Sequence, residues 1–175
     1  MERAYQQFLD RLYAARGCTV ERISGRANRN YDLLLQGVPT EEKSVHNGRA
    51  EVAFEVLQDV AGLATAKWNA HGATAVLPLT AIGNQFITRA QQQVWYIESE
   101  GNPVAVWMLD SHGLRDWYLV PDNFRQCRLY TVVRGFGLTI CACSPLPQLK
   151  QAGIAEQWWA LGDSVPTADD DPWAW

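Results

Sequence analysis

The sequence predicts an α+β fold in which an amphipathic helix packs on a mixed β-sheet. Within residues 2–16, apolar side chains recur at helical spacing: Tyr5, Phe8, Leu9, Leu12 and Tyr13. Beyond this segment, short apolar runs alternate with turn residues such as Asn, Gly and Pro, a pattern typical of strands. One helix followed by several strands indicates a sheet with a helix on its face.

The first third of the chain is expected to contain four strands after the helix. Gly17 is placed to end the helix in a left-handed conformation. The strands are expected over residues 18–23, 31–35, 40–46 and 50–57, with a loop over 24–30 and a turn over 36–39. Asn47-Gly48 predicts a hairpin between the last two strands, because this pair favours a two-residue β-turn.

The remainder of the chain gives a weaker pattern at first and a stronger one later. Residues 59–93 are interpreted as an insertion, with a helix over 60–69, a strand or buried turn over 73–79 and a loop or helix over 82–93. Strands are then expected over 94–98 and 104–109, separated by a turn over 99–103, and over 129–133 and 138–143, with helices over 111–119 and within 145–161. Pro121-Asp122 is interpreted as a turn.

Composition predicts a globular protein in a reducing compartment. The chain has 175 residues and 47% hydrophobic content, which suits one domain over 1–161 and a tail over 162–175. No apolar run approaches the roughly 20 residues that cross a bilayer, and no secretory signal is visible, so a cytoplasmic location without membrane contact is expected. Cys18, Cys127, Cys141 and Cys143 lack metal-ligand spacing and are expected to be buried free thiols.

The negative net charge is concentrated at the end of the chain. The five acids from Glu156 onward are accompanied by no Lys or Arg. Without them, residues 1–155 carry 15 basic and 14 acidic residues, a net charge of +1 against −4 for the whole chain. A local basic cluster that binds phosphate is therefore compatible with this composition.

Asp32, Glu41 and Lys43 are the residues that point most directly to a chemistry. Asp32 begins an apolar run, and Glu41-Glu42-Lys43 lies on the next expected strand. Because side chains alternate along a strand, Glu41 and Lys43 are expected on one face and Glu42 on the other. Two carboxylates on adjacent strands can hold a hard cation, and a neighbouring lysine can act on water or phosphate.

These segments resemble the PD-(D/E)XK nuclease superfamily, which includes type II restriction enzymes and archaeal Holliday-junction resolvases. The resemblance covers residues 2–57: a helix headed by Glu2, a strand, Asp32 at the start of a second strand, then Glu41-Glu42-Lys43 followed by Ser44. Tyr31 stands where the motif has proline. The resemblance implies a restriction-endonuclease-like mixed sheet with flanking helices in α/β/α-type layers.

The resemblance also implies a metal-dependent nuclease that hydrolyses DNA phosphodiester bonds. Asp32, Glu41 and Glu2 would hold Mg²⁺ or Mn²⁺, and Lys43 would position water or stabilise charge on the phosphate. The implied catalytic residues are Glu2, Asp32, Glu41 and Lys43. DNA is the implied partner, and a homodimer is compatible with the family. Contacts to the DNA backbone are expected from a group of nearby polar residues: Arg22, Ser24, Arg26, Arg29 and Arg49.

Three alternatives remain open at this level. Glu41, Glu42 and Lys43 are also what an exposed edge strand would carry, because edge strands favour charge. The same fold with a degenerate site would act as a nucleic-acid-binding or protein-interaction module. The end of the tail, Asp169–Trp175, is similar to the acidic, aromatic-tipped C-termini of single-stranded-DNA-binding proteins, which implies docking of a protein partner.

Overall fold

The structure is a computed structural model that describes residues 4–23, 31–57, 90–134 and 137–164. In chain order its elements are α1 (Ala4–Ala15), β1 (Val20–Arg22), β2 (Leu33–Leu35), β3 (Val38–Val45), β4 (Glu51–Leu57), β5 (Gln92–Ser99), β6 (Asn102–Asp110), α4 (Ser111–Leu119), α5 (Pro121–Arg125), β7 (Arg128–Arg134), β8 (Gly137–Pro145), α6 (Leu146–Gln151) and β9 (Ala155–Ala160). This mixture of helices and strands confirms the predicted α+β class.

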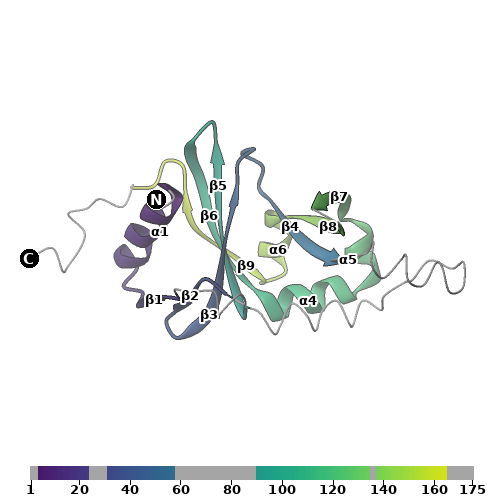
Figure 1. Cartoon of the computed structure of the whole chain (residues 1–175), viewed down its shortest axis with the longest axis horizontal. Coiled ribbons are helices and arrows are strands. Elements are labelled where there is room, and N and C mark those ends of the chain that lie inside the picture. The colour runs from purple at the N-terminus through teal and green to yellow at the C-terminus, as the bar shows by residue number, and fades with distance from the viewer. Residues whose placement is uncertain (1–3, 24–30, 58–89, 135–136, 165–175) are drawn as a thin grey trace, which may run out of the picture.

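Two sheets and their helices form three layers (Figure 1). The larger sheet has six strands in the order β1-β2-β3-β5-β6-β9, and the smaller sheet has three in the order β4-β8-β7. Helix α1 covers one face of the larger sheet, and the smaller sheet lies on the opposite side with α4, α5 and α6. All pairings among the named strands are antiparallel except that of β3 with β5.

The first core lies between α1 and the larger sheet. The predicted apolar face of the helix provides Phe8, Leu9, Leu12 and Tyr13, all of which are buried. They pack on buried side chains of the sheet: Leu33, Leu35, Val94, Tyr96, Val106 and Trp159. Gly17 ends the helix with φ +68°, as expected for its C-terminal cap. Burial of this face is the main force that holds α1 against the sheet.

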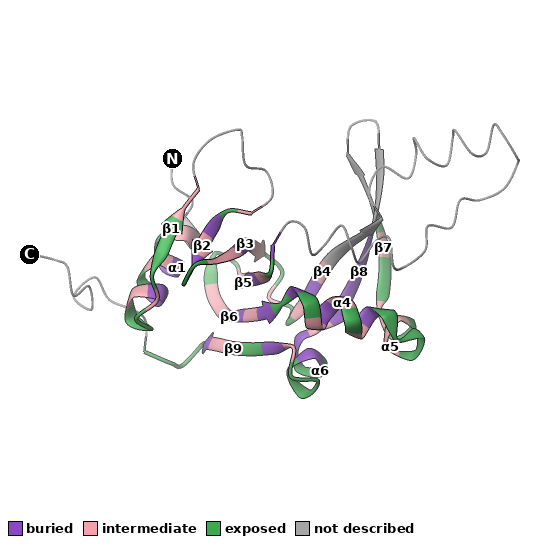
Figure 2. Ribbon diagram, turned by 90° about the horizontal axis from the view of Figure 1, so that it is seen from below, coloured by how far each residue is buried: buried purple, intermediate pink, exposed green. Residues whose placement is uncertain are grey.

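The second core lies between the two sheets. Trp95, Ile97, Trp107 and Leu109 of the larger sheet meet residues of the smaller sheet and of α4 and α6, including Val52, Ala142, Leu114, Leu146 and Leu149. Strand β5 is buried on both faces, since Val94 and Tyr96 enter the first core whereas Trp95 and Ile97 enter the second (Figure 2). This explains its continuous apolar run.

Two hairpin turns are shorter than predicted. Leu35 pairs with Val38, so the turn is only Gln36-Gly37 and not residues 36–39. Gln36 and Gly37 both have positive φ, 52° and 77°, as a type I′ turn requires. The β5–β6 hairpin has the same form at Glu100-Gly101. Two positive-φ residues are enough to reverse the chain with the twist that the flanking strands need. The prolines at 39 and 103 therefore lie near the start of the strands that follow the turns.

The predicted hairpin at Asn47-Gly48 is wrong. Strand β4 does not return beside β3 but leaves the larger sheet and pairs with β8 in the smaller one. Parallel β5 occupies one edge of β3 over Thr40–Val45, whereas β2 pairs with the other edge only over Val38–Thr40. Gly48 retains a positive φ of 68°, and its N–H donates to the carbonyl of Glu98 at the end of β5.

The second half follows the prediction with two corrections. Helix α4 and strands β5, β6, β7 and β8 occupy the expected segments. Pro121-Asp122 begins the short helix α5, because proline suits the first helical turn. The expected helix within 145–161 is α6 followed by strand β9, which pairs with β6.

Several sequence predictions lie outside the described residues. They include the loop over 24–30, most of the insertion and nearly all of the tail. Of the cysteines, all four are free thiols, and Cys141 and Cys143 are buried. Among the described helices, none is long and apolar enough to span a membrane.

We expect Gly37→Ala to destabilise the protein by about 1–2 kcal/mol, because an alanine in the left-handed region brings its Cβ against the backbone. An added Cβ would meet no other atom within 4 Å, so backbone strain is the only cost. Urea denaturation measures the change. Gln36→Asn is the matched variant and should stabilise slightly, since Asn tolerates positive φ. Equal stability of Gly37→Ala and wild type would show that this turn does not require glycine.

Candidate functional site

Strand β3 directs its two glutamates to opposite faces of the larger sheet. The ammonium of Lys43 forms an ion pair with Oε1 of Glu41, so these side chains share one face. The carboxylate of Glu42 instead receives the hydroxyl of Tyr13 from α1. Val45, two residues beyond Lys43, packs on the core between the sheets. Glu41 and Lys43 therefore lie on the face turned toward the smaller sheet, as strand alternation predicts.

Asp32 stands where β2 and β3 separate. Its N–H donates to the carbonyl of Thr40, and its own carbonyl accepts from the N–H of Ile23. Its carboxylate oxygen Oδ2 accepts from the backbone N–H of Glu42 at 2.7 Å. The side chain thus takes the place of a strand acceptor that β2 no longer provides, and it is held against β3 by a charge-assisted hydrogen bond.

Asp32, immediately before β2, forms a row with Glu41 of β3 and Gln93 of β5. Leu33 is in register with Thr40 on β3, so Asp32 falls opposite Glu41 one residue further on. Leu33 belongs to the α1-facing core, and alternation assigns Asp32 to the other face, with Glu41. Glu41 is in register with Gln93 of the parallel strand β5. The ammonium of Lys43, drawn to Glu41, joins this row.

The row offers a donor set that suits a hard divalent cation. Asp32 is exposed, and the side chains of Glu41 and Lys43 are 30% and 41% exposed. Asp32 uses Oδ2 and Glu41 uses Oε1 in the bonds above, and carboxylate oxygens accept more than one partner. Oxygen ligands of this type are those that Mg²⁺ prefers. Among the described residues, no three His, Cys, Asp or Glu side chains gather as a metal-binding group.

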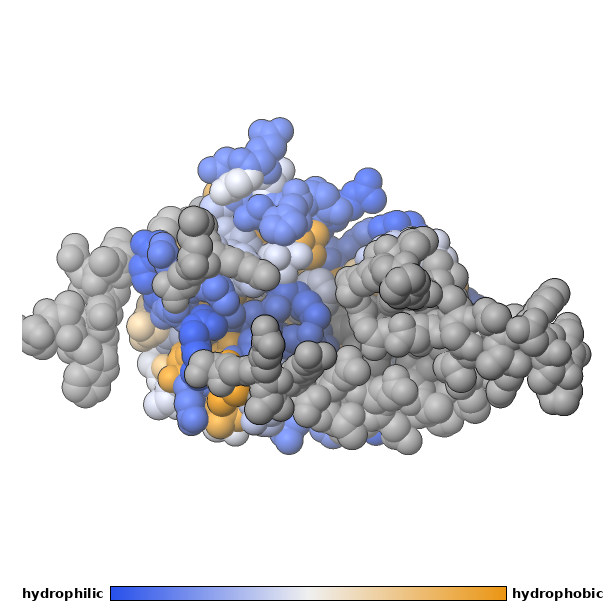
Figure 3. Space-filling view, in the orientation of Figure 1, coloured by the Kyte–Doolittle hydropathy of each residue, from blue (hydrophilic) through white to orange (hydrophobic). Residues whose placement is uncertain are grey.

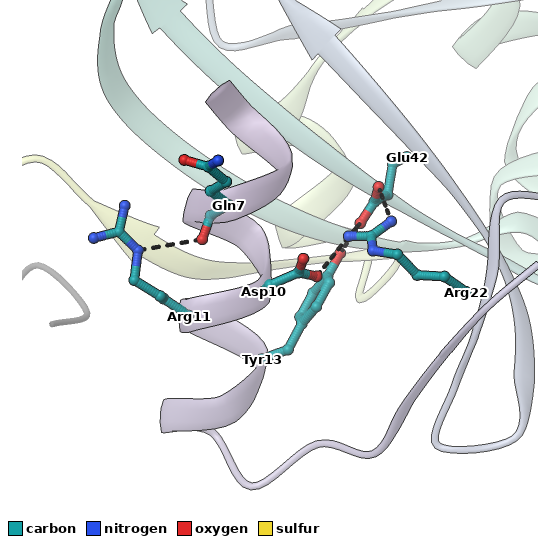
Figure 4. Close-up of polar contacts among 6 residues, drawn as sticks. All are labelled: Gln7, Asp10, Arg11, Tyr13, Arg22 and Glu42. Carbon is teal, nitrogen blue, oxygen red and sulfur yellow. Dashed lines mark hydrogen bonds and ion pairs between the residues drawn. The ribbon is translucent and has the colours of Figure 1, made fainter. Parts of the chain in front are cut away.

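On the opposite face, Glu42 is the centre of a buried polar cluster (Figure 4). Its side chain is only 1% exposed. Tyr13 donates to Oε1 at 2.9 Å, and Arg22 of β1 donates to Oε2 at 3.0 Å and to Oε1 at 3.2 Å. Arg22 also reaches Oδ1 of Asp10 on α1 at 2.6 Å. One carboxylate therefore connects α1, β1 and β3.

The charges of this cluster are mutually dependent. Burial alone would lower the pKa of Arg22, but its hydrogen bonds to Glu42 and Asp10 outweigh burial and raise it. Burial and the negative charge of Glu42 together raise the pKa of Tyr13, so its hydroxyl remains a donor. Removal of one partner from a buried ion pair typically costs about 3–5 kcal/mol, because the other charge loses its compensation.

One residue predicted to bind DNA, Arg22, is part of this buried cluster. Arg22 directs its guanidinium into the interior between two carboxylates. Arg49 is exposed after β3, and its backbone N–H donates to the side chain of Asn47. Glu2, predicted as a ligand, and Ser24, Arg26 and Arg29, predicted to contact DNA, lie outside the described residues.

A second polar group occupies the far end of β3. Ser44 Oγ lies 3.2 Å from Nε2 of His46, whose Nδ1 lies 2.6 Å from Oε1 of Glu98. Ser44 is in register with Tyr96, a member of the α1-facing core, so this group lies on the face away from Glu41. The neighbouring tip of the β5–β6 hairpin is hydrophilic (Figure 3). We interpret the group as a solvated end of the sheet.

Sequence reasoning missed Asp10, Tyr13 and Gln93. Tyr13 was placed in the apolar face of the helix, which is correct for its ring, but its hydroxyl also binds Glu42. The available signal was Glu42 itself: if α1 covers that face of β3, a carboxylate there needs buried donors. Gln93 carried no local signal, because its relation to Glu41 depends on the parallel pairing of two distant strands.

Comparison of the chain with protein-family models, with curated protein sequences and with solved structures found no match.

We expect the stability of the protein to fall above pH 10, and Tyr13→Phe to weaken that dependence. The pKa of Tyr13 is raised in the folded protein, so its contribution is fully present below the ordinary tyrosine pKa of about 10 and is lost as the pH rises above it. The loss is about 1.4 kcal/mol per pH unit for this group. Urea denaturation from pH 8 to 11 compares the two proteins.

The expected curves differ most at neutral pH and converge at alkaline pH. Tyr118, whose pKa is also raised by burial, is present in both proteins and contributes equally to each curve. Curves that stay parallel up to pH 11 would contradict the assigned role of the Tyr13 hydroxyl.

We expect Asp32→Asn to be nearly as stable as wild type and Asp32→Ala to lose about 1 kcal/mol. The amide oxygen of Asn can still accept from the N–H of Glu42, whereas Ala leaves that N–H without its side-chain acceptor. Thermal or urea unfolding provides the measurement. Similar destabilisation by both substitutions would mean that the charge of Asp32, and not its role as acceptor, supports the β2–β3 junction.

Proposed function

We propose that the protein is a metal-dependent nuclease that hydrolyses DNA phosphodiester bonds at Asp32, Glu41 and Lys43. The observation that carries this proposal is the Glu41–Lys43 ion pair on β3, with the carboxylate of Asp32 held by the backbone N–H of the intervening Glu42. Both side chains of the ion pair are partly exposed. Phosphodiester hydrolysis needs both oxygen ligands for a cation and a positive group near the phosphate.

Asp32 and Glu41 would hold Mg²⁺ or Mn²⁺, which when bound would neutralise charge on the phosphate and favour deprotonation of water. Hydrogen bonds within the chain orient the site residues without a bound metal. The N–H of Glu42 orients the carboxylate of Asp32. The buried anchoring of Glu42 sets the face on which its neighbours Glu41 and Lys43 project.

Lys43 has the position of a group that binds a phosphate oxygen or orients water. Its ammonium is held beside the carboxylate of Glu41 by their ion pair. A lysine ammonium has three donors and a compact charge, so it can serve an anionic oxygen while still contacting a carboxylate. Partial exposure of both side chains leaves room for a substrate to approach.

The order of the elements supports a restriction-endonuclease-like fold. Helix α1 and strand β1 precede Asp32, which immediately precedes β2, and Glu41 and Lys43 lie in β3. This order agrees with the PD-(D/E)XK arrangement that the sequence resembles. A mixed sheet whose central strand carries the site, with layers on both faces, is compatible with that fold.

We expect Glu41→Gln, Asp32→Asn and Lys43→Ala each to lower metal-dependent nicking of plasmid DNA by about 100-fold or more, a loss typical of one charge-stabilising group. The assay uses plasmid and single-stranded DNA with Mg²⁺ or Mn²⁺, and with EDTA as a blank. Lys150→Ala and Glu98→Gln are the matched controls, because both residues lie outside the proposed site, and they should retain activity.

Cleavage that survives both Asp32→Asn and Lys43→Ala would contradict the proposed site. DNA binding by the wild type without metal-dependent cleavage would instead identify a binding module on the same fold.

A further inference from the structure

Gln93 is a buried polar residue whose environment is largely apolar. It is only 3% exposed, on a strand whose next four residues, Val94–Ile97, are also buried. Its antiparallel neighbour on β6 is Leu109, which is fully buried. A buried amide that lacks part of its hydrogen bonding costs about 1–3 kcal/mol. Because the amide oxygen has a buried partner, the NH₂ group is the part that requires an explanation.

Trp95 fixes the orientation of this amide. The indole Nε1–H of Trp95 donates to Oε1 of Gln93 at 3.0 Å. An indole nitrogen is a donor only, so the atom it meets must be the amide oxygen and not the nitrogen. The two N–H bonds of Nε2 then project away from Trp95. None of the hydrogen bonds between described residues has this nitrogen as its donor, and it is not one of the fully buried side-chain atoms without a partner.

The oriented amide belongs to the same row as the proposed nuclease site. Gln93 is in register with Glu41, and residues in register on parallel strands project from the same face. The ammonium of Lys43 is drawn to Glu41 by their ion pair. Glu41 is therefore flanked by two kinds of donor, a neutral amide on β5 and an ammonium on β3.

We propose that Gln93 and Lys43 form the phosphate-binding half of the site, taking non-bridging oxygens of a phosphodiester while Asp32 and Glu41 form the cation-binding half. The choice of ligand rests on the proposed nuclease function. Carboxylates repel phosphate, so an anionic substrate needs donors on the opposite side of them. A neutral amide provides a donor without competing for the cation. Gln93 acts as a positioning residue, and Trp95 holds its amide ready before the substrate arrives.

The test replaces Gln93 with Leu, which has a similar size and no donor. Gln93→Leu should fold but lose about 1–3 kcal/mol, because it removes the buried acceptor of the Trp95 indole N–H. Its KM for DNA should rise about tenfold, since the loss is in substrate binding, and its dependence on metal concentration should not change. Gln92→Leu is the matched control: Gln92 bonds to Thr40 and to the carbonyl of Leu35, so this variant should lose stability but keep its KM.

A second measurement does not depend on cleavage. The side-chain amide resonances of Gln93 are identified in an NMR spectrum as the pair missing from Gln93→Leu. Titration with the dinucleotide TpT, which contains one phosphodiester, should shift this pair, and Lys43→Ala should weaken TpT binding about fivefold or more. Equal titration with uncharged thymidine would overturn phosphate recognition, as would an unchanged KM in Gln93→Leu.

The two proposals fail in different ways. A shift of the Gln93 amide by TpT, in a protein that cleaves no DNA, supports the phosphate subsite and contradicts the nuclease. Cleavage that depends on Asp32 and Lys43, without any TpT-dependent shift at Gln93, supports the nuclease and overturns the subsite.

Discussion

The buried carboxylate of Glu42 is the interaction on which the arrangement of this protein depends. It accepts from Tyr13 of α1 and from Arg22 of β1, and Arg22 continues to Asp10. Helix, edge strand and central strand are thus joined through one group that is nearly excluded from water. Because a slip of β3 by one residue would move Glu42 to the other face and leave its partners uncompensated, the register of this strand is strongly specified.

The same anchor determines what the opposite face presents. With Glu42 turned toward α1, Glu41 and Lys43 must project toward the smaller sheet, where they pair and remain partly exposed. The backbone N–H of Glu42 then meets Asp32 at the point where β2 leaves β3. A structural cluster on one face and a candidate site on the other are therefore two consequences of one strand. These two roles of β3 explain why three consecutive charged residues occur in the middle of a sheet.

The parallel pairing of β3 with β5 contributes the other half of the candidate site. It places Gln93 beside Glu41 and occupies one edge of β3 over Thr40–Val45. Strand β4 joins the smaller sheet, which closes the second core over Trp95 and Trp107. Glu41 and Gln93 thus come from strands that are separated by a long stretch of chain but adjacent in the sheet.

Local patterns in the sequence were enough to predict helix α1 with its apolar face, the positions of most strands, and the projection of Glu41 and Lys43 from one face. These features depend on periodicity and on the alternation of side chains, which are local properties of the chain. The two hairpin turns were located correctly but made too long, because proline at 39 and 103 was interpreted as a turn residue although it continues a strand.

Only the tertiary structure decided which strands are neighbours and where each charge is directed. Arg22, expected at the surface, is directed inward because Glu42 and Asp10 meet it from two other elements. Gln93 lies beside Glu41 because two distant strands pair in parallel. Such contacts depend on how separate segments pack together, and no local pattern in either segment specifies them.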